Sequence, residues 1–171
     1  MNNQKKEKGF TIIEVVLVLA IAGLIFLMVF LALPALQRNQ RDTQRKNDLS
    51  RLQTAVTSYT SNNRGSLPTA AAWGTLVNNY LSNGAAGSDS FQDPAGANTT
   101  TPSATYILTA SGNGTTGVLA GAFSSVTNQN LIYYTIGATC GSGGGDTIAA
   151  GTRKVALRMY LEGGGIACVN N

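Results

Sequence analysis

An uninterrupted apolar run near the N-terminus constrains this chain more than any other feature. From Val15 to Leu33 there are nineteen consecutive residues without a charge, nearly all of them large and apolar. As a helix this run is about 28 Å long, close to the hydrocarbon thickness of a bilayer. A helix on a soluble core would carry a polar stripe, and this run has none. The sequence therefore predicts a membrane segment.

Three kinds of membrane segment fit this position. An ordinary secretory signal has a shorter apolar stretch followed by small residues of the A-x-A type, and Leu33-Pro34-Ala35-Leu36 matches that pattern poorly. A signal anchor that is never cleaved stays open. The third kind is cleaved before the apolar run, at Lys8-Gly9-Phe10, and it accounts for an acid that the other two leave unexplained.

That acid is Glu14, one turn inside the apolar segment. A carboxylate in hydrocarbon is costly unless it has a partner or lies near the interface. Thr11-Ile12-Ile13-Glu14 spells a capping box with Thr11 as the N-cap, and an acid suits the positive end of a helix. Cleavage after Gly9 favours a second interpretation, because it frees an amine on Phe10. In a filament the amine of one copy can neutralise Glu14 of the next, which would fix the register between helices.

These residues resemble the leader and start of a type IV prepilin, with its class III signal peptide. The match includes a short basic leader ending at Gly9, then Phe10, and Glu14 as the fifth mature residue. It is close over residues 5–36 and looser as far as Pro68. The resemblance implies that a prepilin peptidase cuts between Gly9 and Phe10 and methylates the Phe10 amine. It also implies that Glu14 aids docking into a growing filament.

The same resemblance implies a cellular location and binding partners. The chain would cross the cytoplasmic membrane once before assembly and then form an extracellular pilus on the cell surface. Its partners would be copies of itself joined through the N-terminal helix, the prepilin peptidase and the inner-membrane assembly platform. A pilus of this kind serves adhesion, twitching motility or DNA uptake. The alternative is a pseudopilin of a type II secretion or competence system, which shares the N-terminal device. Cations flank both ends of the apolar run, so the positive-inside rule gives no clean orientation; a leader on the inside follows from the resemblance alone.

Two helix breakers lie in the apolar segment. Gly23 lowers helix propensity, and Pro34 lacks the N–H that would continue the hydrogen-bond ladder. The resemblance implies that they kink the helix and that backbone nearby can melt during assembly. The other interpretation is that Pro34 marks the membrane boundary.

The helix is expected to continue over residues 37–64. Its first part is polar all round, and we expect ion pairs of Asp42 with Lys46 and of Asp48 with Arg51. An apolar stripe then predicts one face laid on a core; its members are Leu49, Leu52, Ala55, Val56 and Tyr59. A C-terminal stop is predicted after it by residues of the type that end helices, namely Asn62, Asn63 and Gly65, with Pro68 beyond.

Residues 65–171 read as a small β head. A short helix is expected near Ala70–Tyr80, and Gly-rich turns favour an antiparallel meander over the apolar stripe. The candidate strands are Thr105–Thr109, Gly117–Ala120, Leu131–Ile136 and Arg153–Leu161. In the last, apolar and polar residues alternate, which is typical of a half-buried strand.

Cys140 and Cys168 are the two cysteines of the chain. In an exported domain such a pair is read as a disulfide, and in a cytosolic chain as two free thiols. A bridge would close a loop of about 29 residues and contribute roughly 3.6 kcal/mol in the chain-entropy model. It would tie down a tail that Gly163-Gly164-Gly165 leaves slack. Many pilins carry a C-terminal disulfide loop, a resemblance of layout only.

Composition argues against catalysis. The chain has no His, which removes Ser-His and Cys-His catalysis and His metal sites. The net charge of +4 comes from two short basic segments, and the head is close to neutral. We therefore expect no nucleic-acid contact by the subunit. A solvated helix face is the expected role of the second basic segment, with anionic lipid or nucleic acid as the alternatives; its cations are Arg38, Arg41, Arg45, Lys46 and Arg51.

Other chemical motifs are weak. Gly112–Gly117 matches G-x-G-x-x-G but is followed by no amphipathic helix and no acid for a ribose, so a turn is expected. Asp89, Asp93 and Asp146 fit surface loops better than a calcium site. The sequence thus predicts no catalytic residue, no cofactor and no metal.

The expected fold is α+β: a long N-terminal helix with a protruding hydrophobic half, packed under a small antiparallel sheet. The expected parts are a leader at 1–9, a membrane or filament-core helix at 10–36, its amphipathic continuation at 37–64, and the head at 65–171.

Overall fold

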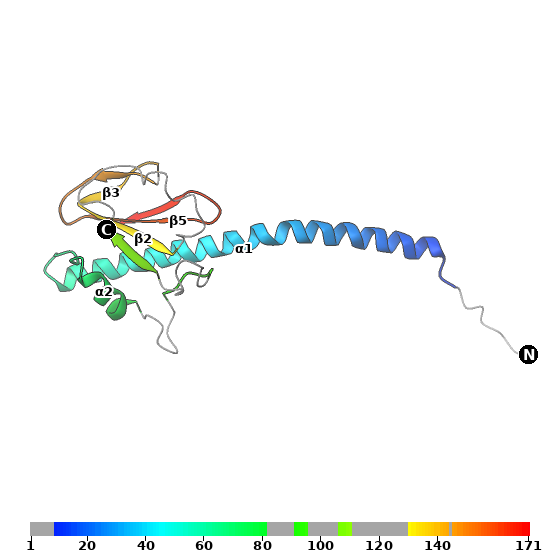
Figure 1. The fold of residues 1–171 in the computed structure, drawn as a ribbon, viewed down its shortest axis with the longest axis horizontal. Coiled ribbons are helices and arrows are strands. Elements are labelled where there is room, and N and C mark those ends of the chain that lie inside the picture. The colour runs from blue at the N-terminus through cyan, green and yellow to red at the C-terminus, as the bar shows by residue number, and fades with distance from the viewer. Residues whose placement is uncertain (1–8, 82–90, 96–105, 111–129, 144) are drawn as a thin grey trace, which may run out of the picture. The chain divides into compact units, whose positions relative to one another are not determined.

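A computed structural model describes residues 9–81, 91–95, 106–110, 130–143 and 145–171 (Figure 1). The chain divides into two compact units, Met1–Gln37 and Arg38–Asn171. The fold is α+β, as predicted. It has two helices, α1 (Ile12–Asn62) and α2 (Ala72–Tyr80), among the described residues. The described strands are β1 (Ile107–Ala110), β2 (Leu131–Ile136), β3 (Ala138–Cys140), β4 (Thr147–Ala149), β5 (Val155–Tyr160) and β6 (Ile166–Asn170).

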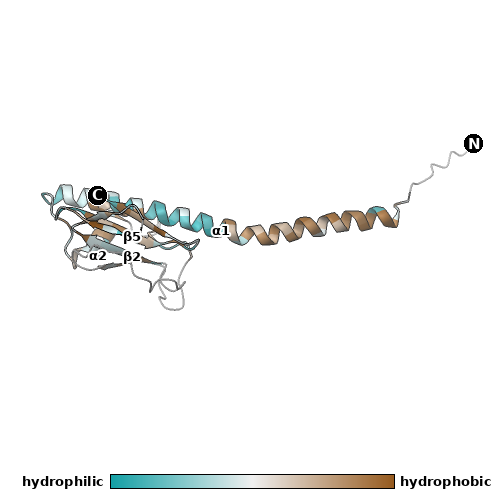
Figure 2. Cartoon of the chain, turned by 90° about the horizontal axis from the view of Figure 1, so that it is seen from above, coloured by the Kyte–Doolittle hydropathy of each residue, from teal (hydrophilic) through white to brown (hydrophobic). Residues whose placement is uncertain are grey.

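Helix α1 changes character along its length. Figure 2 shows its first half in the brown of apolar residues and the following stretch in the teal of polar ones. It continues through Pro34 and ends at Asn62. Arg64 and Gly65 then take positive φ angles of 55° and 81°, and the Gly65 N–H donates to the carbonyl of Thr60 at 2.7 Å. This is a left-handed C-terminal cap, where the sequence predicted the stop.

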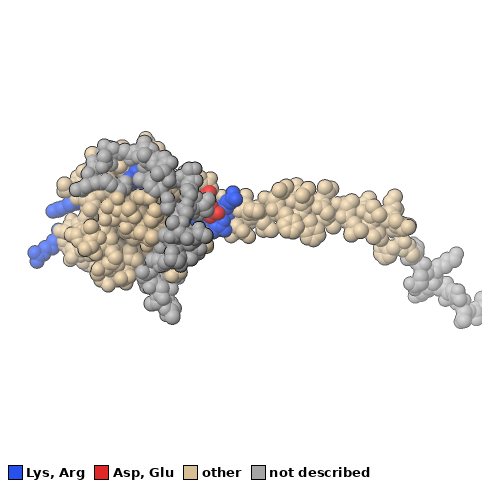
Figure 3. Space-filling model, viewed as in Figure 1, with Lys and Arg blue, Asp and Glu red and all other residues tan. Residues whose placement is uncertain are grey.

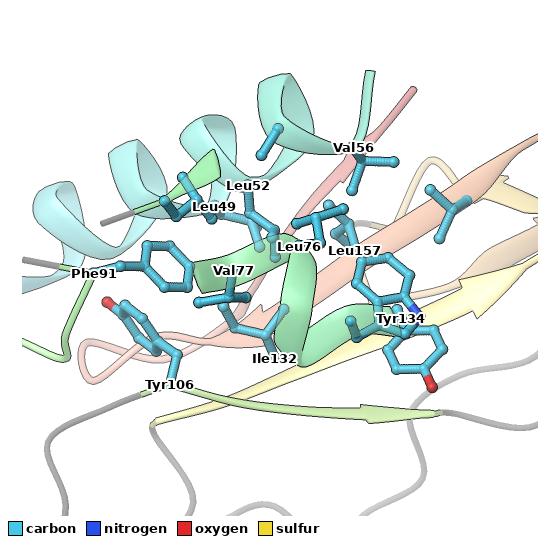
Figure 4. Packing of buried hydrophobic residues seen from close by; sticks show 14 of the residues in the cluster. Leu49, Leu52, Val56, Leu76, Val77, Phe91, Tyr106, Ile132, Tyr134 and Leu157 are labelled. Atoms are coloured by element: carbon cyan, nitrogen blue, oxygen red, sulfur yellow. The ribbon is translucent and has the colours of Figure 1, made fainter. Parts of the chain in front are cut away.

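The apolar stripe of α1 is buried as predicted. Leu49, Leu52 and Val56 are fully buried, and they pack in one cluster with Leu76 of α2 and Leu157 of β5 (Figure 4). Helix α2, expected near residues 70–80, thus shares the core face of the sheet with α1. Burial of these side chains is the main stabilising term of the second unit.

The main sheet is mixed, which corrects the predicted antiparallel meander. Its strand order is β1-β2-β5-β6. β1 pairs with β2 in parallel, whereas β2–β5 and β5–β6 are antiparallel. Parallel neighbours need a crossover rather than a tight turn, and residues 111–129, which lie between β1 and β2, are outside the described residues. The candidate strand Gly117–Ala120 falls among them.

The prediction that the strand near the C-terminus is half-buried was wrong. Val155 to Met159 are all buried, and Arg158 on the face opposite the core is only 1% exposed. The reason is a second layer, the antiparallel pair β3–β4, which the sequence did not predict. Arg158 donates to the carbonyl of Gly145, between β3 and β4, at 2.8 Å and to Thr135 Oγ1 at 3.1 Å.

The Gly163-Gly164-Gly165 segment is a tight turn between β5 and β6, not the slack tail expected from its composition. The Leu161 N–H donates to the Gly165 carbonyl and the Gly164 N–H to the Leu161 carbonyl, at 3.1 and 3.2 Å. Gly164 and Gly165 have φ angles of +96° and +88°, a region that favours glycine. These glycines therefore shape a hairpin.

Candidate functional site: the N-terminal junction and the polar part of α1

The junction between Gly9 and Phe10 is accessible. Both residues are exposed, and the side chain of Phe10 is 89% exposed. A Cβ added to Gly9 would meet no atom within 4 Å, and its φ lies outside the positive region. Neither contact with the described residues nor backbone conformation therefore requires glycine at this position.

Glu14 lies next to this junction. Its Oε2 accepts the backbone N–H of Thr11 at 3.0 Å and the Thr11 hydroxyl at 2.8 Å. The helix begins at Ile12, so Thr11 is the N-cap and Glu14 occupies N3. The side-chain-to-backbone half of a capping box is thus present. Because both groups are exposed, the carboxylate is open to a second partner as well.

No residue of the apolar part of α1 is buried, and all but the half-buried Ala22 are exposed. Helix α1 is the only helix in the described part of the chain that is long and apolar enough to cross a membrane, and 0% of its apolar window is buried. The helix of a soluble core would be mostly buried. Gly23 has open space around an added Cβ, although glycine costs about 1 kcal/mol relative to alanine in a helix. Contacts in the described part of the chain therefore do not require glycine at position 23.

Three features occur together at this end of the chain. The glycine junction is accessible, an apolar helix starts at Ile12, and an acid lies in its first turn. Comparison with protein families finds a match to this part of the chain. The chain carries the prokaryotic N-terminal methylation motif. This motif matches residues 4–30 and is the class III signal peptide of type IV pilins. Neither the curated proteins nor the solved structures contained a match to the chain.

The motif supports a coarse assignment. It supports a type IV pilin-like protein or a pseudopilin, and proteins of this kind are structural subunits rather than known enzymes. The apolar helix and the motif together fit a membrane-anchored pilin. Residues 1–8, with the predicted basic leader, lie outside the described residues.

The polar part of α1 holds a buried ionic cluster that the sequence did not predict. Arg45 is fully buried; its Nη2 lies 2.8 Å from Asp93 Oδ1, and its Nη1 lies 3.2 Å from Asp42 Oδ1 and 3.6 Å from Glu162 Oε2. We expected a helix segment that is polar all round, with Asp42 paired to Lys46. The structure corrects this: Asp42 pairs with Arg45, one residue before Lys46, because Arg45 points inward.

Asp93 was expected in a surface loop, and this prediction was wrong. The residue is 4% exposed, since its carboxylate forms the ion pair with Arg45 and accepts the Ala95 N–H at 2.9 Å. Asp89 and the G-x-G-x-x-G segment at Gly112–Gly117 lie outside the described residues. Within the described ranges, no group of three potential metal ligands among His, Cys, Asp and Glu comes together.

Two further pairs extend the cluster. Arg41 donates from Nε and Nη2 to the two carboxylate oxygens of Glu162, the first at 2.7 Å. These hydrogen bonds lower the pKa of Glu162, against a smaller opposing effect of burial. Asp48 pairs with Arg51 at 3.1 Å, as predicted, and accepts the Tyr106 hydroxyl at 3.0 Å. Burial raises the pKa of Asp48.

The two cysteines are joined in a disulfide in the structure. Cys140 ends β3 and Cys168 lies within β6, so the bond ties the β3–β4 pair to the edge strand of the main sheet. Asn170 of β6 helps, because its Oδ1 accepts the Cys140 N–H at 3.4 Å. The covering layer over Arg158 is thereby fixed covalently.

Proposed function

We propose that this chain is a structural subunit of a type IV pilus. A prepilin peptidase removes the leader between Gly9 and Phe10 and methylates the new amine. The mature chain waits in the cytoplasmic membrane and then polymerises through α1 on the inner-membrane assembly platform, to be displayed on the cell surface. The observation that carries this proposal is the methylation motif at residues 4–30, together with an apolar helix segment of which 0% is buried.

Glu14 is proposed to guide the assembly step. A filament core of packed apolar helices is non-directional, so a charge pair is needed to set the register. Cleavage places a free amine on Phe10, adjacent to Thr11, whose N–H already contacts Glu14. In the filament, the amine of one subunit would pair with Glu14 of its neighbour. Gly23 and Pro34 are proposed to let the helix bend or melt locally while subunits pack.

The alternative is a pseudopilin of a type II secretion or competence system. The N-terminal device does not separate the two, because both share it. The Cys140–Cys168 disulfide favours the pilin, since the resemblance associates C-terminal disulfide loops with pilins and calcium-stabilised heads with pseudopilins. Electron microscopy of cells that carry an epitope-tagged chain separates them: surface filaments that bind the antibody support the pilin.

Mass spectrometry of the mature N-terminus tests the processing step. A first residue of N-methylated Phe10 is expected. An intact Met1 in membrane-embedded protein would contradict the proposal and support a signal-anchored protein of another class.

A set of Glu14 variants tests the assembly role against simple helix capping. Glu14→Gln keeps a side-chain acceptor for Thr11 and a residue type found in capping boxes, but it loses the charge; Glu14→Asp keeps the charge. If Glu14 acts in docking, E14Q and E14A should both be cleaved normally and lose incorporation in competition with wild type. If E14Q competes as well as wild type, Glu14 is a helix cap and the docking role is wrong.

A further inference from the structure

In the polar part of α1, acidic and basic side chains differ in their exposure to solvent. The acids near it are buried or paired: Asp42, Asp48 and Asp93 are 7%, 3% and 4% exposed, and the side chain of Glu162 is 17% exposed. Figure 3 shows acidic and basic atoms adjoining on the visible face, with few charges elsewhere on the described surface in that view.

Several Arg and Lys side chains of the same stretch are exposed to solvent. The side chain of Arg38 is 59% exposed, and its nearest recorded acid is Glu162 at 3.9 Å. Lys46 is exposed, and Arg41 keeps 29% of its side chain exposed although it binds Glu162. The surface of this stretch is therefore cationic although the whole cluster is nearly balanced. We call Arg38, Arg41 and Lys46 the cationic collar.

The collar follows the membrane segment directly along the helix. Arg38 comes five residues after Leu33, which is about 7.5 Å of helix rise. The headgroup layer beyond the hydrocarbon is roughly 5–8 Å deep on each side. Long side chains on a helix lean toward its N-terminus, which is here the direction of the apolar run. Lys46 comes thirteen residues after Leu33, and salt screens most of the attraction of so distant a charge to the surface, so Arg38 contributes more.

The position of these cations also needs a reason. Cations on the translocated side of a membrane segment oppose the usual orientation bias. Arg45 has such a reason, since it holds together the buried cluster, whereas Arg38 has only a long ion pair with Glu162 at 3.9 Å and Lys46 is exposed. The sequence predicted a solvated face. Burial of Asp42, Asp48 and Asp93, and the pairing of Glu162 with Arg41, argue instead for an anionic partner outside the protein.

We propose that the cationic collar binds the anionic headgroups of the membrane in which the unassembled subunit waits. This inference rests on the proposed membrane-anchored function and names the lipid class that the subunit selects. Glu162 sets the strength of the contact, because it neutralises Arg41 and part of Arg38. Phosphatidylglycerol is the probe for this headgroup chemistry.

The test uses the full chain in phosphatidylcholine vesicles with spin-labelled phosphatidylglycerol or phosphatidylcholine as probes. The measured quantity is the association constant for the first lipid relative to the second. The wild type should prefer phosphatidylglycerol, and R38Q/K46Q should lower the preference by about fivefold, the effect of roughly one cation at a membrane surface. The matched control R153Q/K154Q removes the same charge from two exposed residues in the β4–β5 connection and should leave the preference unchanged.

A second variant separates lipid binding from a structural role of the cluster. Glu162→Gln frees Arg38 and Arg41, so it should raise the preference for phosphatidylglycerol, whereas damage to the fold would lower it. Asp146→Asn, with the same change in charge, is its control. The proposal is overturned if R38Q/K46Q matches R153Q/K154Q, if E162Q does not exceed D146N, or if a short DNA duplex removes the lipid preference at stoichiometric amounts. A chain that enters neutral vesicles without selecting lipid refutes this inference alone; one that enters no vesicle also refutes the proposed anchoring.

Discussion

The carboxylate of Asp42 on α1 accepts the backbone N–H of Gly163 at 2.7 Å, across 121 residues of sequence. Its other oxygen accepts the N–H of Glu162, also at 2.7 Å. Two successive amides that converge on one anion form an anion-binding nest, and here the anion is a side chain of the same protein. The β5–β6 turn is in this way attached to the helix.

Replacing Asp42 with Asn should destabilise the second unit by about 1–3 kcal/mol. An amide offers a single acceptor oxygen and places an NH2 group against one of the two backbone N–H groups. Thermal unfolding of the detergent-solubilised chain, followed by near-ultraviolet circular dichroism, measures the effect. If Asp42→Asn leaves the melting temperature unchanged, the nest contributes no stability.

Gly163→Ala should also destabilise, through contact rather than backbone strain. A Cβ at Gly163 would lie 3.0 Å from Asp42 Oδ2, and Gly163 is not among the glycines of positive φ. Gly151→Ala is the matched control, since its Cβ would meet nothing within 4 Å. In the background of Asp42→Ala, most of the destabilisation caused by G163A should vanish, because the clashing atom is gone. If G163A destabilises both backgrounds equally, the strain lies elsewhere.

Arg45→Ala should be far more harmful than Arg38→Ala. Removing Arg45 leaves Asp93 and Asp42 buried without their cation, at a cost of about 3–5 kcal/mol. Arg38 is mostly exposed, and an exposed ion pair contributes less than about 1 kcal/mol. Chemical denaturation of both variants compares them. Similar midpoints for the two would mean that the buried cluster is not a stabilising unit.

Glu162 should make the fold sensitive to acid. Its pKa is lowered on folding, mainly by the hydrogen bonds from Arg41. A carboxyl of this kind stabilises the fold above its unfolded pKa, about 4.3, and the contribution is lost as the pH falls through the lower folded pKa. Asp48 has the opposite sign, because burial raises its pKa, and its contribution is lost as the pH rises through the folded pKa.

The measurement is the difference in melting temperature between wild type and E162Q, in which the effect of Asp48 cancels. This difference should be largest near neutral pH and shrink as the pH falls through the unfolded pKa, about 4.3, and below it. A difference that stays constant over this range would show that Glu162 does not titrate with a lowered pKa.

Loss of the disulfide should destabilise the fold by up to about 3.6 kcal/mol in the chain-entropy model. C140S/C168S should melt at a lower temperature than the oxidised wild type. Reductant should lower the melting temperature of the wild type and leave that of the double variant unchanged. If reductant has no effect on the wild type, the cysteines are not joined in solution.

Local patterns predicted a large part of this fold. The 3-4-3 spacing of Leu49, Leu52 and Val56 determined which face of α1 is buried, because helical periodicity is a property of adjacent turns. The stop after Asn62 followed from Gly65, since few residues other than glycine take a left-handed conformation easily. Local residue patterns also predicted a cleavage junction at Gly9–Phe10 and an assembly role for Glu14, and the methylation motif spans these residues.

The remainder depended on which distant segments meet. Arg45 and Asp93 are separated by 48 residues, and neither has a local feature that distinguishes a buried ion from a solvated one. The alternating pattern of β5 suggested one exposed face. In the structure the β3–β4 pair covers that face, so both faces of β5 are buried. The sequence by itself determined the N-terminal device, the helices and the buried stripe; the tertiary structure alone decided the ionic cluster, the parallel pairing of β1 with β2 and the role of the glycine turn. The physical reason is that a charge or a glycine acquires its role from the partner it meets, and that partner is set by the path of the whole chain.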